Sequence, residues 1–257
     1  MLIDTHAHIY LPKFDEDRAA VMNRATEAGV HKIFLPNVDS TTIPSMLKLE
    51  ADYPERCFAM MGLHPCSVKE NFEEELAIVK SWLDKRPFCA VGEIGMDLYW
   101  DKTFFQQQSD AFKKQIGWAI ELDIPIVIHS RESTEIVIEI LKEMKHPKLR
   151  GIFHCFSGNE TQARTIVDLG FYLGIGGVLT YKKSTLPAAI KDIPLEWLVL
   201  ETDSPYLPPV PYRGKRNESA YIHQIGDYLA SVKQLPFERI AMQTTKNALR
   251  IFDKSEF

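Results

Sequence analysis

Two histidines that follow the first apolar stretch of the chain could together bind a metal ion. Residues 1–8 read Met-Leu-Ile-Asp-Thr-His-Ala-His, a short strand pattern that ends in His-x-His. Side chains two residues apart on a strand face the same side, so His6 and His8 can share one ion. An isolated pair of this kind would be explained more simply as a chance feature of a surface strand.

Further metal-binding residue types recur where later apolar stretches end, namely Glu93, His129, His154 and Asp203. Four imidazoles and two carboxylates are too many for one tetrahedral centre, but they suit two divalent ions bridged by a carboxylate. The mixed nitrogen and oxygen set allows Zn²⁺ or Mn²⁺ and suits Mg²⁺ less well, because Mg²⁺ prefers oxygen ligands. The sequence therefore predicts a two-metal site without choosing the metal.

The elements that must position these residues alternate along the whole chain. Apolar stretches predict strands at 2–6, 32–36, 57–63, 88–93, 125–129, 151–154, 171–175 and 197–201. Amphipathic stretches predict helices at 15–29, 41–53, 72–85, 104–122, 133–144, 160–169, 186–193, 219–233 and 237–252. This alternation predicts an α/β fold, a single (β/α)₈ TIM barrel over residues 1–257. An open doubly wound sheet is the alternative, weakened by the absence of G-x-G-x-x-G after the first strand.

A barrel would bring the six candidate ligands to one place, because the carboxyl ends of its strands meet at one mouth. The candidates follow five different predicted strands. Each alone could be a packed histidine or a solvated carboxylate. Six polar groups at the same end of a barrel favour the metal site over packing.

Composition limits the classes of function and the compartment. The chain has 257 residues and a net charge of −5, which argues against coating nucleic acid through an overall basic surface but leaves room for a local basic patch. No apolar run is long enough to span a membrane, and no leader pattern opens the chain. Four cysteines without a C-x-x-C pair are expected to be reduced thiols. We expect a cytoplasmic monomer.

Six short motifs together give the chain a family resemblance. They are Asp4-Thr5-His6-Ala7-His8, Gly62-Leu63-His64-Pro65, Gly92-Glu93-Ile94-Gly95-Met96-Asp97, His129-Ser130-Arg131-Glu132, His154-Cys155-Phe156-Ser157-Gly158 and Glu201-Thr202-Asp203-Ser204-Pro205-Tyr206-Leu207. In this order the chain resembles, over its whole length, the TatD family of metal-dependent deoxyribonucleases among the amidohydrolase-like barrels. It departs from the family pattern at Cys66, where many relatives carry histidine, and at Ser219, where proline is usual.

The resemblance implies roles for the candidate ligands. His6, His8 and Asp203 would hold one ion, His129 and His154 the other, and Glu93 would bridge them. Asp203 would also act as general base, so that Asp203 and Glu93 are the predicted catalytic residues.

Two acidic residues lie one layer deeper than predicted ligands. Glu201 precedes Asp203 by two residues, and Asp4 stands likewise before His6. We expect both to orient ligand histidines. For Asp4, a buried carboxylate paired for structural reasons explains the sequence nearly as well.

Polar, cationic and aromatic residues on the loops at the same end suggest the substrate. His64, Arg131, Arg216 and Asn217 are the predicted substrate contacts, the last two within the family pattern Arg-Gly-x-x-Asn-Glu. Further loop cations are Lys182, Lys183, Arg213 and Lys215, and aromatic residues that could stack bases are Tyr99, Trp100, Tyr181, Tyr206 and Tyr212.

These residues predict a nuclease that acts on ends of single-stranded DNA. The same site could instead hydrolyse an amide, a lactone or an aminoacyl ester. An inactive nucleic-acid-binding or metal-storage protein is the third hypothesis, and the complete ligand set argues against it.

Overall fold

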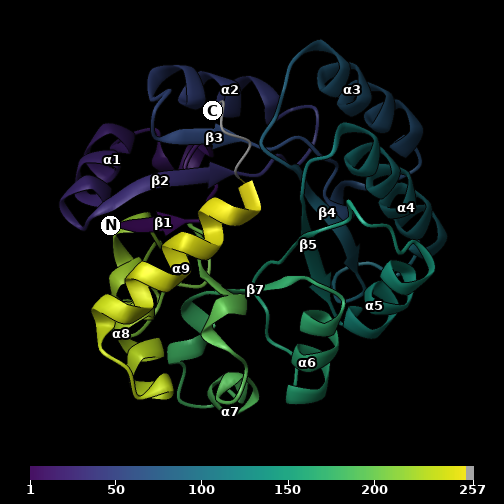
Figure 1. Cartoon of the computed structure of the whole chain (residues 1–257). Helices are drawn as coiled ribbons and strands as arrows, with labels where there is room; N and C mark the ends of the chain where they lie inside the picture. Colours follow the sequence, from purple (N-terminus) through teal and green to yellow (C-terminus); the bar gives the residue numbers. More distant parts are fainter. Residues whose placement is uncertain (253–257) are drawn as a thin grey trace.

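Parallel strands form an inner barrel and helices surround it (Figure 1) in the computed structural model, which describes residues 1–252. The strands are β1 Leu2–Asp4, β2 Val30–Leu35, β3 Cys57–Ala59, β4 Val91–Asp97, β5 Ile126–Arg131, β6 Gly151–Phe153, β7 Tyr172–Ile175 and β8 Leu198–Leu200. The helices are α1 Arg18–Glu27, α2 Ile43–Asp52, α3 Phe72–Lys85, α4 Phe105–Leu122, α5 Thr134–Glu143, α6 Glu160–Asp168, α7 Leu186–Ile190, α8 Ile222–Lys233 and α9 Phe237–Phe252. Short 3₁₀ helices lie at Pro12–Phe14, Pro65–Ser67, Gly177–Thr180, Leu195–Trp197 and Ser219–Tyr221.

The barrel is closed by two seams between its continuous ladders. One ladder runs β1-β2-β3 and the other β4-β5-β6-β7-β8, all parallel. Met61 N donates to Ala90 O at 3.1 Å across the first seam. Thr5 N donates to Leu200 O at 3.1 Å across the second. The predicted (β/α)₈ barrel is thus confirmed.

Alternation along the strands separates two apolar layers. On β5, Ile126 and Ile128 pack outward among the residues that meet the helices, whereas Val127 belongs to the cluster inside the barrel. The same alternation turns His129 inward at the end of that strand. Both layers are buried, so apolar burial fixes which way the polar residues at the mouth point.

A bulge in β4 sets the direction of Glu93. Gly92 pairs with Val127 and Ile94 with Ile128, which leaves Glu93 as an extra residue in the ladder. Its side chain is turned into the barrel mouth and is buried.

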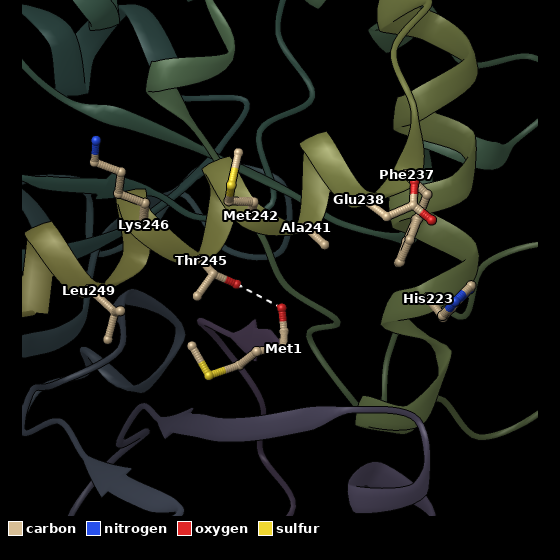
Figure 2. Close-up of a pocket in the computed structure, with 9 residues that line it drawn as sticks. All are labelled: Met1, His223, Phe237, Glu238, Ala241, Met242, Thr245, Lys246 and Leu249. Atoms are coloured by element: carbon tan, nitrogen blue, oxygen red, sulfur yellow. Dashed lines mark hydrogen bonds between the residues drawn. The ribbon is translucent and has the colours of Figure 1, made fainter.

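Helix α9 crosses the end of the barrel opposite the mouth (Figure 1). Phe252 stacks on Phe34 of the inner layer at 3.8 Å between ring centroids. Asn247 donates its amide hydrogens to Leu195 O and Leu198 O, at 2.8 and 2.7 Å. Between α8, α9 and Met1 lies a cavity of about 710 Å³ (Figure 2).

Several predicted element ends differ from the structure. The third strand stops at Ala59 rather than at residue 63, and α7 ends at Ile190 rather than at 193. The cysteines are free thiols, as predicted, with Cys57 and Cys89 buried. Among residues 1–252, the structure has no helix of the length and apolar character that a membrane crossing requires.

Candidate metal centre

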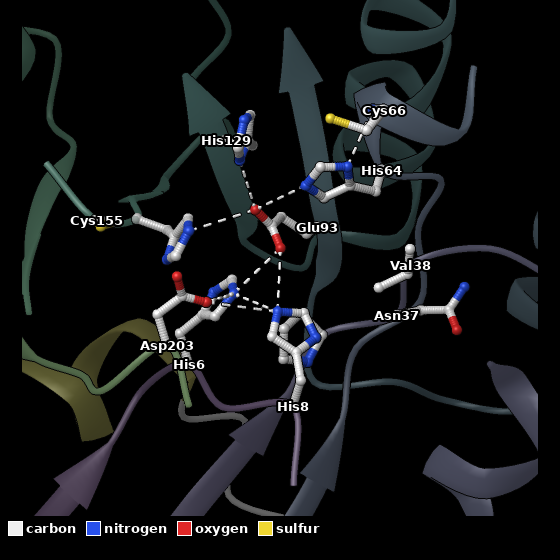
Figure 3. Close-up of polar contacts among 12 residues, drawn as sticks. His6, His8, Asn37, Val38, His64, Cys66, Glu93, His129, Cys155 and Asp203 are labelled. Atoms are coloured by element: carbon white, nitrogen blue, oxygen red, sulfur yellow. Dashed lines mark hydrogen bonds and ion pairs between the residues drawn. The ribbon is translucent and has the colours of Figure 1, made fainter. Parts of the chain in front are cut away.

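The barrel mouth brings together all six predicted ligands. Figure 3 labels His6, His8, Glu93, His129 and Asp203 among them. Five of them line a cavity of about 430 Å³, and the sixth, His6, lies fully buried beneath it. The ligands come from the ends of five strands: His6 and His8 after β1, Glu93 on β4, His129 on β5, His154 after β6 and Asp203 after β8.

One oxygen of Glu93 lies close to three other possible ligand atoms, which belong to His6, His8 and Asp203. The Nε2 atoms of His6 and His8 are 3.2 Å apart. Oε2 of Glu93 lies 3.1 and 3.5 Å from them, and Oδ1 of Asp203 lies 3.8 and 3.6 Å from them. Two imidazole nitrogens and two carboxylate oxygens this close together form a donor set that a divalent cation fits.

Tyr10 fixes which nitrogen of His8 faces this group. Its hydroxyl donates to Pro36 O and lies 2.8 Å from His8 Nδ1. Since its one hydrogen is used, the tyrosine oxygen must accept the hydrogen of Nδ1. Neutral His8 therefore presents the lone pair of Nε2 to the site, as a metal ligand must.

The second oxygen of Glu93 faces a different set of histidines. Oε1 lies 2.9 Å from His129 Nδ1 and 3.4 Å from Nε2 of both His64 and His154. One carboxylate thus separates two groups of imidazoles, which is the arrangement a bridging ligand requires. The rings of His129 and His154 are 6.2 Å apart, and His64 approaches Glu93 as closely as His154 does.

His64 is set up as a hydrogen-bond donor. Cys66 N donates to its Nδ1 at 3.0 Å, so neutral His64 carries its hydrogen on Nε2, the atom that points at Glu93. A donor at the mouth agrees with the predicted role as a substrate contact. Because the bond comes from the backbone of Cys66, the departure from histidine at this position leaves it intact.

Asp97 is a site residue that sequence reasoning missed. Its Oδ2 lies 2.8 Å from His129 Nε2, while His129 Nδ1 faces Glu93. A proton on the nitrogen toward Asp97 leaves the other nitrogen free for a metal. The available signal was alternation: Gly95 pairs with His129 and Asp97 with Arg131, so Asp97 lies on the inward face.

Glu201 lies beside His154, at the place predicted for a residue that orients a ligand histidine. Its Oε1 lies 3.0 Å from His154 Nδ1 and accepts a hydrogen bond from Cys155 N. The carboxylate occupies space that only glycine leaves open on β7, because a Cβ on Gly174 would lie 2.2 Å from Glu201 Oε2. Gly174 therefore makes room for the Glu201 carboxylate.

Asp4 does not orient a ligand imidazole, and this prediction is corrected. Its carboxylate accepts from Thr202 N at 2.9 Å and from the hydroxyls of Thr202 and Ser219 at 2.6 Å each. Its contact with His6 is to the backbone nitrogen, at 3.3 Å. Asp4 thus ties β1 to the segment after β8, and Ser219 supplies a hydroxyl that proline could not.

Asn217 and Arg216 do not line the cavity, so the structure does not place either residue where a substrate contact was predicted. Asn217 is fully buried and donates to Thr202 O and Tyr206 O, at 2.7 Å each. Arg216 donates to both carboxylate oxygens of Asp17, at 2.7 and 2.8 Å. Both side chains hold the loop after β8, and of the predicted substrate contacts, His64 and Arg131 line the cavity.

Burial and mutual charge shift the pKa values of the cluster. Burial disfavours ionisation of Glu93, but the facing histidines, His64 first, outweigh it and hold the pKa of Glu93 well below its usual range. Burial also opposes protonation of His154, yet Glu201 and Glu93 raise its pKa to about 10. Burial raises the pKa of Asp203 to about 6. The carboxylates favour positive charge here, the condition under which a divalent cation binds.

Comparison with known proteins places the chain among metal-dependent hydrolases. Residues 3–253 match the model of a family described as TatD related DNase. The chain is 39% identical over 253 residues to YabD of Bacillus subtilis (strain 168), described as an uncharacterized metal-dependent hydrolase, with 98% of this chain and 99% of the relative covered. YjjV, a TatD homolog from Escherichia coli K12, has a crystal structure that matches with a TM-score of 0.92 at 33% identity, covering 98% of this chain and 97% of that one. A TatD-family hydrolase from Entamoeba histolytica, 21% identical, shares the fold with a TM-score of 0.82, covering 98% of this chain and 97% of that one.

Proposed function

Because the chain belongs to the TatD family of metal-dependent hydrolases, we propose that it cleaves phosphodiester bonds at the ends of single-stranded DNA. The observation that carries the proposal is the position of Glu93, between two groups of imidazoles and at the base of a cavity lined by Arg131 and Trp100. We place the activity in a cytoplasmic monomer, with which the four free thiols, all within the described residues, are consistent.

The residues divide the chemistry among them. His6, His8 and Asp203 would hold one divalent ion, and Glu93 would bridge it to a second ion held by His129 and His154. Such ions, when bound, make water a nucleophile at neutral pH and offset charge on the phosphoryl oxygens. Asp203 would accept the proton of the attacking water.

The mouth favours a single strand over a duplex. A cavity of about 430 Å³ is of the size that binds small ligands, and it accommodates one nucleotide rather than a stacked base pair. His64 Nε2 and the Arg131 guanidinium supply donors for phosphate oxygens. An end, or a nucleotide turned out of a strand, reaches Glu93 most directly.

A second candidate is hydrolysis of a neutral ester, lactone or amide. It is favoured by one observation: among the described residues that line the cavity, Arg131 is the one lysine or arginine, alongside Glu93, Asp97 and Asp203. Two further loop cations are engaged elsewhere: Arg216 pairs with Asp17, and Arg213 lies over the Tyr181 ring.

Hydrolysis of end-labelled single-stranded DNA tests the proposal directly. Metal-stripped protein is resupplied with Mg²⁺, Mn²⁺ or Zn²⁺ and incubated with strands labelled at the 5′ or the 3′ end. We expect stepwise shortening that is lost in Asp203→Ala, with the ladder giving the polarity. Absence of cleavage with every metal, in protein shown to bind two ions, would favour the neutral ester or amide instead.

A further inference from the structure

A large exposed tryptophan stands at the rim of the catalytic cavity. Trp100 lies in the loop between β4 and α4, lines the cavity, and keeps 69% of its surface exposed. Tyr99 beside it is 48% exposed, so this loop presents two adjacent aromatic rings to solvent at the edge of a polar site.

Arg131 and Tyr99 support this indole from the neighbouring strand and from the same loop. The Arg131 guanidinium carbon lies 3.7 Å from the Tyr99 ring centroid and 5.3 Å from that of Trp100. The two rings meet edge to face, with centroids 4.9 Å apart and planes at 85°. A cation and two aromatic rings thus form one cluster, which we call the rim cluster.

Asp97 fixes the rim cluster relative to the catalytic histidines. Its Oδ1 accepts hydrogen bonds from the backbone nitrogens of Tyr99 and Trp100, at 3.0 Å each, while its Oδ2 faces His129. One carboxylate therefore sets both the position of a predicted metal ligand and the start of the loop that carries the indole.

Two other aromatic residues on the mouth loops, Tyr212 and Tyr181, are held by contacts of their own. Tyr212 stacks on Tyr221 with centroids 3.8 Å apart and planes at 7°. The Tyr181 ring carries the Arg213 guanidinium, and its hydroxyl donates to Pro208 O. Trp100 is the more exposed of the two large aromatic residues that line the cavity, Tyr206 being 44% exposed.

We infer that the rim cluster is a nucleobase-binding subsite, in which Trp100 stacks on the base next to the scissile phosphodiester and Arg131 contacts the adjoining phosphate. The inference rests on the proposed function and names how that function selects its substrate. Stacking requires an unpaired base with a free face, so the subsite favours single strands and tolerates any base.

Removing the indole and removing the bases should have the same effect. We would measure kcat/KM of the Mn²⁺-loaded enzyme for a short thymidine strand and for the same strand with abasic internal positions. Trp100→Ala should lower the value for the thymidine strand about 5- to 100-fold and leave the value for the abasic strand unchanged. Trp100→Phe should restore most of the loss, and Tyr228→Ala, which removes an exposed ring on α8, should change nothing.

Fluorescence gives a readout that is independent of turnover. Adding the thymidine strand to metal-free protein should quench tryptophan emission, and the quench should vanish in Trp100→Phe. Equal losses on thymidine and abasic strands, or an unchanged Trp100→Ala, would overturn the subsite while leaving the nuclease proposal standing. If the wild-type enzyme neither cleaves nor binds either strand, both the subsite and the nuclease proposal would be overturned.

Discussion

The tautomer of His8, a predicted metal ligand, depends on the hydroxyl group of Tyr10. The Tyr10 hydroxyl donates a hydrogen bond to Pro36 O and accepts one from His8 Nδ1, so that His8 Nε2 is free for a metal. Partners of this kind change metal affinity by about 10- to 100-fold when they are removed. The Tyr10 side chain is otherwise buried and apolar in its surroundings.

We therefore expect Tyr10→Phe to weaken binding of the first ion by about 10-fold or more while the protein stays folded. Calorimetric titration of metal-stripped protein with Zn²⁺ or Mn²⁺ measures this. Tyr172→Phe, at a buried tyrosine of β7 that packs against Trp197, is the matched control and should bind as wild type does. Unchanged affinity in Tyr10→Phe would remove the argument about the tautomer.

Glu93 is expected to be the least replaceable residue of the site, since its two oxygens face different imidazole groups. Glu93→Ala should abolish hydrolysis and lower the number of ions bound per chain, measured by elemental analysis after dialysis. Glu93→Gln, of the same shape but without charge, should bind metal more weakly than wild type. A fully active Glu93→Ala would refute the bridging assignment.

At this scale the sequence could predict the ligands but not all of their partners. His-x-His and the residues at strand ends are visible as residue types in a pattern, and the structure brings all six together. Asp97 and Tyr10 were not predicted. Both act through hydrogen bonds to other segments, Asp97 to His129 on β5 and Tyr10 to Pro36 after β2, and these partners depend on how the segments pair in the folded chain.

The loop after β8 is held to helix α1 by charge. Arg216 binds Asp17 through both nitrogens and stacks on Phe14, and Arg24 joins Asp17 to Glu218. Because of this bidentate geometry and the additional partners, the network should contribute more to stability than an ordinary surface ion pair does.

Arg216→Ala should consequently lower the free energy of unfolding by about 1 kcal/mol and leave kcat for DNA largely unchanged. Urea denaturation measures the first and the end-labelled assay the second. Lys215→Ala, the neighbouring cation without an ion pair at Asp17, is the control. A selective loss of DNA binding in Arg216→Ala would show that Arg216 contacts the substrate after all.

The contribution of Arg216 should also depend on pH. Its hydrogen bonds to Asp17 lower the pKa of that carboxyl to about 2, below the value of about 3.9 for an unfolded chain. A depressed pKa contributes stability that is fully present above the unfolded value and is lost as the pH falls toward the folded one. The difference between wild type and Arg216→Ala should thus be constant above pH ~5 and shrink between about pH 4 and 2. A difference that grows on acidification would contradict the assignment.

The order of strands and helices was predictable from the sequence, whereas the role of the loop after β8 was not. Apolar stretches that alternate with amphipathic ones indicate a parallel barrel wherever they occur. The partner of Arg216 lies 199 residues away in sequence, and Asn217 finds its acceptors in a turn whose conformation no local pattern encodes. Polar residues in a family motif were therefore assigned to the substrate, although they support the loop.

At the scale of the whole molecule, the site spans both seams of the barrel. His6 and His8 come from the ladder β1-β2-β3, and the other ligands come from β4-β5-β6-β7-β8 or the segment after it. Ions bound here would link two ladders that are otherwise joined by few backbone bonds at each seam. Any ligand that binds only the folded state stabilises it, by about 2.7 kcal/mol at 100 times its dissociation constant.

Chelation should therefore lower the melting temperature of the whole barrel in one cooperative step. With about 2–4 °C per kcal/mol for a protein of this size, we expect a fall of about 5–10 °C when metal-loaded protein is stripped, followed by calorimetry. Glu93→Ala should already melt lower in the presence of metal and respond little to the chelator. A chelator effect of equal size in Glu93→Ala and wild type would place the stabilising ions elsewhere. An unchanged wild-type melting temperature would mean that the two seams hold without them.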